Sequence, residues 1–149
     1  VQGGASRQLS VLNGLEALAN TPPEFVAIHD GARPFVRPDD IAGCLDAAAA
    51  AGIDGAILGI ALADTLKRVA RDGAISETVP RANLWRAQTP QVFRFAPLLQ
   101  AHRSAAVLGA DESTALTDDA AVAEEGLERS GLWTRDLPGR HFAGLGHPR

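Results

Sequence analysis

The segment that most constrains the fold of this chain is Phe25-Val26-Ala27-Ile28-His29-Asp30-Gly31-Ala32-Arg33-Pro34. Its first four residues are apolar and two of them are Val or Ile, which is the pattern of a short buried strand. The strand leads directly into polar residues and a proline. Ligands of open α/β sheets bind just beyond the carboxyl ends of strands, so Asp30 could hold a metal there and Arg33 a phosphate. In the alternative interpretation, these two residues cap a helix and pair with each other.

Length and composition limit the class of protein. The 149 residues, 46% of them apolar, are enough for one globular domain with a core. No run approaches the roughly 18 apolar residues that span a bilayer, and no charged-then-apolar leader opens the chain. The net charge of −4 argues against nucleic-acid binding. The single cysteine, Cys44, excludes an internal disulfide framework and is expected in the core. Because the chain has no Met and opens on Val1, we expect it to start within a longer reading frame.

Hydrophobic spacing predicts an alternation of helices and strands. The expected elements are a helix around 11–18, the strand 25–28, a helix from 38 to 52, a strand over 55–62, a β-hairpin over about 64–82, a helix around 97–103 and a helix over 117–126. The strand–helix–strand order up to residue 62 predicts a right-handed parallel crossover. The Asp72-Gly73 turn predicts the hairpin, which is marginal alone and should pack against something, such as a second subunit. From about Gly131 no clean period remains, and an irregular tail is expected.

Two groups of residues could bind phosphate or nucleotide. Gly3 and Gly4, ahead of Ser10, could bring backbone N–H groups close to a nucleotide, although a Gly-Gly pair is more often a plain turn. On the hairpin and directly after it, the cations Lys67 and Arg81, with Thr65, could hold a phosphate. The alternative for this second group is a solvated arm.

The histidines give no metal signature. His29, at the end of the predicted strand, is either a base or a satisfied structural residue. His102, His141 and His147 lack the spacing of a zinc site with Cys or acids, so zinc is not expected. The chain has no dinucleotide-binding glycine motif, Walker-type loop or nucleophile elbow.

Five motifs together resemble the 2-C-methyl-D-erythritol 4-phosphate cytidylyltransferase family, in the family's order and spacing over residues 1 to about 127. They are Gly3-Gly4-x-x-Arg7-x-x-Ser10-Val11-x-x-Gly14-Leu15, His29-Asp30-Gly31-Ala32-Arg33-Pro34, Asp64-Thr65-x-Lys67, Arg81-x-x-Leu84-Trp85-x-x-Gln88-Thr89-Pro90-Gln91-x-Phe93 and Thr117-Asp118-Asp119-Ala120. The resemblance implies an α/β, Rossmann-like nucleotidyltransferase sheet with flanking helices and a protruding β-hairpin arm.

The resemblance also implies an activity. The substrate phosphate attacks the α-phosphorus of CTP and releases pyrophosphate, a step in isoprenoid precursor synthesis that needs Mg²⁺ or another divalent cation. A cytoplasmic homodimer is implied, in which the arm reaches the partner subunit's site. By family likeness the nucleotide-binding residues are Gly3, Gly4, Ser10 and Gly31. The residues implied to bind the second substrate are Asp30, Arg33, Thr65 and Thr117, with Asp30 also the metal ligand and Arg81 the catalytic residue that positions the phosphate for attack.

Two family segments have no counterpart in the sequence. The family begins with a glycine-rich triphosphate loop, and it ends with a Lys-containing segment that helps to hold the substrate phosphate. We therefore expect residues 1–127 to form a partial nucleotidyltransferase domain, with the arm at about 64–82, and residues 128–149 to form a divergent, irregular tail. Two other hypotheses stay open: a non-catalytic, dimerising remnant, or a related sugar-phosphate nucleotidyltransferase that uses another base or alcohol.

Overall fold

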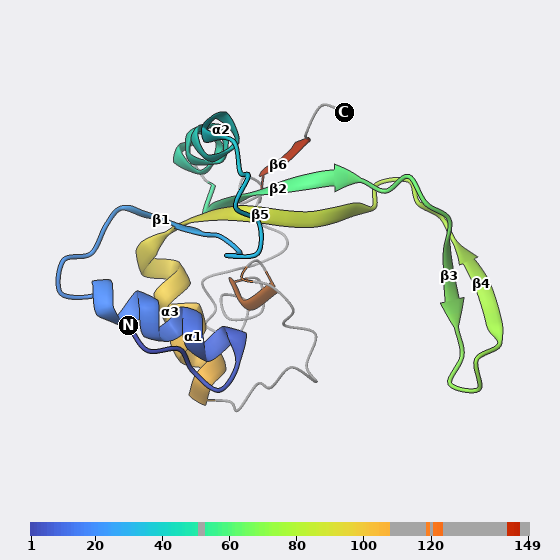
Figure 1. Cartoon of the computed structure of the whole chain (residues 1–149), viewed down its shortest axis with the longest axis horizontal. Coiled ribbons are helices and arrows are strands. Elements are labelled where there is room, and N and C mark those ends of the chain that lie inside the picture. Colours follow the sequence, from blue (N-terminus) through green and yellow to red (C-terminus); the bar gives the residue numbers. More distant parts are fainter. Residues whose placement is uncertain (51–52, 108–118, 120, 124–142, 147–149) are drawn as a thin grey trace.

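The computed structural model describes residues 1–50, 53–107, 119, 121–123 and 143–146. In this part of the chain the elements are, in order, α1 (Arg7–Leu18), β1 (Phe25–Ile28), α2 (Pro38–Ala49), β2 (Gly55–Ala61), β3 (Leu66–Val69), β4 (Ile75–Val79), β5 (Trp85–Arg94), α3 (Phe95–Val107) and β6 (Ala143–Gly146). Four strands form a sheet, and β3 and β4 form a separate hairpin that projects from the body (Figure 1). The predicted α/β fold with flanking helices and a protruding hairpin is confirmed.

The sheet is mixed, with the strand order β1-β5-β2-β6. The central strand β5 runs antiparallel to both β1 and β2, and β2 runs parallel to β6. Strands β1 and β2 therefore point the same way, as the predicted crossover requires, but they are not neighbours because β5 lies between them. The sequence patterns did not predict β5 as a strand. They also predicted a buried β1, whereas this strand is only half-buried and has Ala27 exposed.

Helices cover both faces of the sheet (Figure 1). Successive side chains of a strand point to opposite faces, and Val92 and Phe93 of β5 show which helices lie on each. Val92 packs with Cys44 and Ala48 of α2, whereas Phe93 packs with Leu15 of α1 and with α3. Cys44 is fully buried, as predicted for a small core residue.

Helix α2 begins where the sequence predicted it, whereas α1 begins at Arg7, ahead of the predicted stretch 11–18. Ser6 caps α1, because its Oγ accepts a hydrogen bond from the Leu9 N–H at 3.2 Å. Helix α2 begins at Pro38 and carries Asp39 and Asp40 in its first turn, where acidic side chains complement the helix dipole. The cap of α1 matters for the site, because it fixes the position of Arg7, which begins the helix, and of the glycine segment just before it.

The predicted hairpin is present, and the tail is partly different from the prediction. The turn contains Gly73 at φ 87°, a conformation that glycine adopts without strain. Within the tail expected to be irregular, Ala143–Gly146 forms β6 alongside β2. All other residues of the tail, and the predicted cap Thr117, lie outside the described residues. None of the helices in the described part of the chain has the length and apolar character needed to cross a membrane.

Candidate functional site

The polar loop that follows β1 carries the two residues that the sequence singled out first. Arg33 Nε lies 3.1 Å from Asp30 Oδ2, so these side chains pair with each other, as the alternative interpretation held, but neither caps α2, whose N-cap is Arg37. Both nevertheless line cavities, and neither side chain is buried. The pairing is therefore part of a site open to ligands and does not exclude a binding role.

A hydrogen-bond network around Thr89 of β5 fixes the start of this loop. The Asp30 backbone N–H donates to Thr89 Oγ1 at 3.2 Å, and the Thr89 hydroxyl lies 3.0 Å from His29 Nδ1. At the other side of the ring, His29 Nε2 lies 2.8 Å from the Arg33 carbonyl oxygen. A carbonyl oxygen can only accept, so Nε2 donates to it, and in the tautomer that carries its proton on Nε2 the Nδ1 atom accepts from the Thr89 hydroxyl. His29 thus stabilises the loop through both ring nitrogens. This is the structural role that the sequence analysis gave as an alternative to a base.

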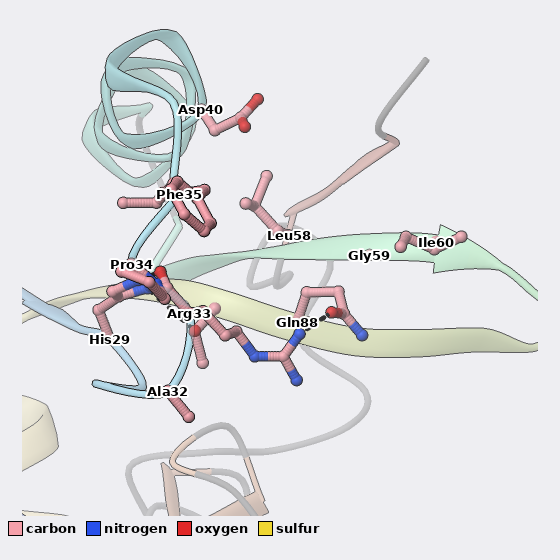
Figure 2. A pocket seen from close by; sticks show the side chains of 12 residues that line it. His29, Ala32, Arg33, Pro34, Phe35, Asp40, Leu58, Gly59, Ile60 and Gln88 are labelled. Atoms are coloured by element: carbon pink, nitrogen blue, oxygen red, sulfur yellow. Dashed lines mark hydrogen bonds between the residues drawn. The ribbon is translucent and has the colours of Figure 1, made fainter. Parts of the chain in front are cut away.

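Three cavities meet at this loop. One of about 490 Å³ lies between the loop, α2 and β2, with Phe35, Leu58 and Gln88 among its lining residues. Figure 2 shows the Arg33 side chain reaching across it to Gln88, whose Oε1 accepts a hydrogen bond from Arg33 Nη1. A second, more open cavity of about 780 Å³ extends from the loop to Ser10 and Val11 of α1. The third, of about 240 Å³, lies between Asp30, Arg33 and residues of β5.

The predicted nucleotide-binding residues converge on the second cavity. Ser10 and Gly31 line it directly. Gly3 and Gly4 do not, but the Gly4 N–H donates to Ser10 Oγ at 2.9 Å, which places the glycine segment beside the cavity. A Cβ on Gly4 would lie 2.5 Å from the Leu9 Cβ, so the close approach of this segment to α1 requires glycine. The structure thus brings four predicted residues together, and their role in nucleotide binding stays a prediction.

The predicted arm residues lie elsewhere. Thr65 and Arg81 flank the hairpin, which projects from the body of the chain (Figure 1). The Arg81 guanidinium contacts the Ala63 carbonyl at the base of the arm, and Lys67 Nζ donates to Thr78 Oγ1 at 2.6 Å within it. None of these residues lines the three cavities. Thr117, the remaining predicted site residue, lies outside the described residues.

The structure adds residues that the sequence analysis did not assign to the site. Gln88, Thr89 and Gln91 line the smallest cavity, and they stand in a motif that had been quoted without a role for them. Arg7 lines two of the cavities and contacts Asp119. Arg7 and Asp119 also lay within quoted motifs, so motif membership was the available signal. Nothing in their spacing showed that they meet.

The carboxylates of the site bear on metal binding. No group of three or more His, Cys, Asp or Glu side chains within the described residues is arranged to hold a metal. Mg²⁺, however, is commonly bound by one or two carboxylates together with substrate phosphates and waters. Asp30 fits that chemistry, because it lines the cavities in which the cations Arg7 and Arg33 favour a phosphate-bearing ligand. A cation at Asp30 Oδ2 would compete with the Arg33 contact.

Comparison with known proteins gives consistent matches. The family model described as 2-C-methyl-D-erythritol 4-phosphate cytidylyltransferase matches residues 1–140. A protein of Nitrobacter winogradskyi named bifunctional enzyme IspD/IspF is 53% identical over 122 residues, which are 82% of this chain and 29% of that protein. The crystal structure of 2-C-methyl-D-erythritol 4-phosphate cytidylyltransferase from Thermus thermophilus matches with a TM-score of 0.74 at 32% identity, over 99% of this chain and 62% of that one. A 4-diphosphocytidyl-2C-methyl-D-erythritol synthase from Anaerococcus prevotii matches with a TM-score of 0.75 at 26% identity, over 99% and 60%.

The mixed sheet, its flanking helices and the cation-bearing loop at the end of β1 define an α/β nucleotidyltransferase fold. Within that class, the chain belongs to the 2-C-methyl-D-erythritol 4-phosphate cytidylyltransferase family. The resemblance found in the five sequence motifs is confirmed. The chain spans 29% of the length of the Nitrobacter relative and 62% of the Thermus structure.

Proposed function

We propose that the chain transfers the cytidylyl group of CTP to 2-C-methyl-D-erythritol 4-phosphate, a step of isoprenoid precursor synthesis. An oxygen of the substrate phosphate forms a bond to the α-phosphorus of CTP. The bond from that phosphorus to the α–β bridging oxygen breaks, and pyrophosphate leaves with the bond's electron pair. Such a reaction depends mainly on positioning the two phosphates and on stabilising the negative charge that develops between them.

The observation that carries this proposal is the convergence of cations and glycines on one set of cavities. Arg33, at the loop after β1, and Arg7, at the start of α1, both line the cavities beside Asp30. Guanidinium groups bind phosphate oxygens through paired N–H donors. Ser10 and the glycine segment border the same space, where a nucleoside would find backbone and hydroxyl partners.

Asp30 is the residue we propose to hold Mg²⁺ together with phosphate oxygens of the ligands. The bound cation would neutralise phosphate charge and strengthen the leaving tendency of pyrophosphate. Around it, Arg33 orients the phosphates, and the His29–Thr89 network keeps the loop in place. Arg7 adds positive charge on the side of α1.

The arm supports a homodimer as part of the proposal. Every residue of β3 is exposed, and the apolar side chains of Val69 and Ile75 are more than half exposed. Two-stranded hairpins are marginally stable alone, and exposed apolar residues on them favour packing against another surface. In the proposed dimer, Thr65 and Arg81 reach the partner subunit's cavities, and Arg81 positions the substrate phosphate.

An activity assay tests the proposal directly. The chain is incubated with CTP, 2-C-methyl-D-erythritol 4-phosphate and Mg²⁺, and pyrophosphate release is measured beside the Thermus enzyme as a positive control. We expect release that requires all three components and that falls when UTP or ATP replaces CTP. Release with another nucleotide instead would favour a related nucleotidyltransferase. Absence of release with every nucleotide would refute the catalytic role of this chain.

The roles of the arm are tested separately. Arg81→Ala should lower kcat/KM for the methylerythritol phosphate, whereas Arg71→Ala, at the hairpin turn of the same arm, should leave it unchanged. Unchanged kcat/KM in both variants would remove Arg81 from the site. Sedimentation of the chain with residues 66–79 replaced by a short Gly-Ser linker should show a monomer where the intact chain is a dimer. A monomer in both cases would contradict the proposed dimer.

A further inference from the structure

A buried contact between a histidine and an aspartate lies beside the candidate site. His102 of α3 and Asp119 are both 0% exposed, and His102 Nε2 lies 3.4 Å from Asp119 Oδ1 in an arrangement that is not a hydrogen bond. Among the described residues, neither ring nitrogen of His102 has a hydrogen-bond partner. A buried carboxylate is costly unless it is paired, and natural structures keep such groups where a specific partner compensates them.

The compensating partner of Asp119 is Arg7. Arg7 Nη2 donates to Asp119 Oδ2 at 2.6 Å, a short, charge-assisted hydrogen bond between residues 112 positions apart in the chain. Burial would raise the pKa of Asp119, but the adjacent His102 and the Arg7 guanidinium outweigh this and hold that pKa below its ordinary value. Asp119 thus stays negatively charged in the folded protein and holds the guanidinium of Arg7 in place.

Arg7 extends from this buried contact to the site. Its side chain is 38% exposed, and the same Nη2 lies 3.9 Å from Asp30 Oδ1. Arg7 lines both the 780 Å³ cavity and the 240 Å³ cavity. A long arginine side chain has many rotamers, and losing them on ligand binding weakens the affinity. A partner that holds the guanidinium in advance removes part of that loss.

We propose that Asp119, supported by His102, is a positioning residue that fixes the guanidinium of Arg7 at the cavity wall beside Asp30, where it receives phosphate oxygens of the nucleotide. The ligand in this inference rests on the proposed function, whereas the positioning does not. Asp119 acts through Arg7 and does not contact the ligand in this role.

A merely structural tie that joins α1 to α3 through Asp119 would be the competing explanation. The chain offers a matched control for it, since Glu16 of α1 pairs with Arg103 of α3 through two contacts of 2.6 and 2.7 Å. That pair joins the same two helices on the surface and lines none of the three cavities. Glu16→Gln therefore removes an interhelical ion pair without changing Arg7.

The first experiment is a double-mutant cycle on CTP binding, measured by calorimetry with this chain and Mg²⁺ at a temperature where every variant is folded. Asp119→Asn should weaken CTP binding about tenfold, as expected when a charge-assisted contact is lost. In an Arg7→Ala background the same change should have less than a twofold further effect, because Asp119 acts through Arg7. Glu16→Gln should leave the affinity unchanged. Equal, additive losses from Asp119→Asn in both backgrounds would overturn the inference in favour of a structural role.

The second experiment does not need a ligand, so it remains decisive if the chain does not bind CTP and the proposed function fails. The side-chain ¹H–¹⁵Nε signal of Arg7 is followed by NMR in the apo protein. We expect a sharp, slowly exchanging signal that broadens in Asp119→Asn and persists in Glu16→Gln. A signal that is unchanged in Asp119→Asn would show that Asp119 does not hold Arg7, and the inference would be wrong whatever the protein binds.

Discussion

Replacing Thr89 by valine tests whether one hydroxyl organises the candidate site. Thr89 is 9% exposed, and its Oγ1 accepts from the Asp30 N–H at 3.2 Å and lies 3.0 Å from His29 Nδ1. Valine has nearly the same shape, so the change removes the hydroxyl without opening a cavity. The Asp30 N–H and His29 Nδ1 then both lose their partner at the start of the loop that carries Arg33.

The magnitude follows from these two hydrogen bonds. Each contributes about 1 kcal/mol net, and an unsatisfied group in a partly buried position costs about as much again at most. Thr89→Val should therefore lower the free energy of unfolding by about 2 kcal/mol. Thr89→Ser keeps the hydroxyl and loses one methyl group, at a cost of about 1 kcal/mol. If about 1.4 kcal/mol is needed to reorder the loop when the ligand binds, CTP affinity of the valine variant falls about tenfold.

Urea unfolding and CTP titration of both variants measure these effects. Thr78→Val is the control, because Thr78 of the arm also has a hydroxyl that accepts a hydrogen bond, from Lys67, but is exposed. It should change the free energy of unfolding by less than about 0.5 kcal/mol. The reasoning would be refuted if Thr89→Val matched Thr78→Val in stability, or if Thr89→Ser lost as much CTP affinity as Thr89→Val.

Three further results are expected. Gly55→Ala should lower the melting temperature, at a cost of about 1–3 kcal/mol, because the new Cβ would collide with the buried Phe93 ring. Gly14→Ala in α1 should raise the melting temperature, because its new Cβ would have nothing within 4 Å. Equal shifts of the two variants in thermal melts would contradict the packing described. Asp119 has a lowered pKa in the folded state, so the stability it contributes is present above its unfolded value and is lost as the pH falls through its folded value, below about pH 4. Acid unfolding followed by circular dichroism should accordingly be less steep in Asp119→Asn, and an identical acid limb would show that Asp119 is not held as an ion in the folded state. Cys44, whose thiol pKa is raised by burial, should react with a thiol reagent only as fast as the protein opens, which rapid labelling of the native protein would disprove.

Local signals in the sequence were enough for the elements with simple patterns. The apolar run of β1 and its polar exit placed Asp30 and Arg33 correctly, and α2 begins at Pro38 as predicted. The Asp72-Gly73 turn located the hairpin. These features depend on neighbours in the chain, which periodicity and turn chemistry report directly.

Contacts between distant segments could not be predicted in this way. His102, Asp119 and Arg7 meet from three separate segments, and no spacing rule links residues 7 and 119. The motifs marked Arg7 and Asp119 as members of the family pattern but did not assign them to each other. His102 had been considered only as a metal ligand and was set aside for lack of spacing. Its burial beside Asp119 is a property of the packed fold.

Pro90 explains both why the sequence patterns did not predict β5 and how the candidate site is organised. Proline cannot donate to a ladder and is disfavoured in central strands, so its presence obscured the strand pattern. In the structure the pairing of β2 with β5 is irregular at this point, passing from Ile57 opposite Gln91 to Gly59 opposite Ala87. Pairing of β1 with β5 covers only residues 91–94 of β5.

Residues 88–90 of this central strand are consequently outside both regular ladders. Gln88 then bonds Arg33, and Thr89 bonds the Asp30 N–H and His29, in place of strand partners. Irregularities of this kind re-aim side chains next to active sites. Pro90 thus makes the strand harder to recognise in the sequence, and it also leaves Gln88 and Thr89 available to bond the loop of the candidate site. It follows that restoring regular pairing here would cost the loop its supports while leaving the fold of the sheet intact.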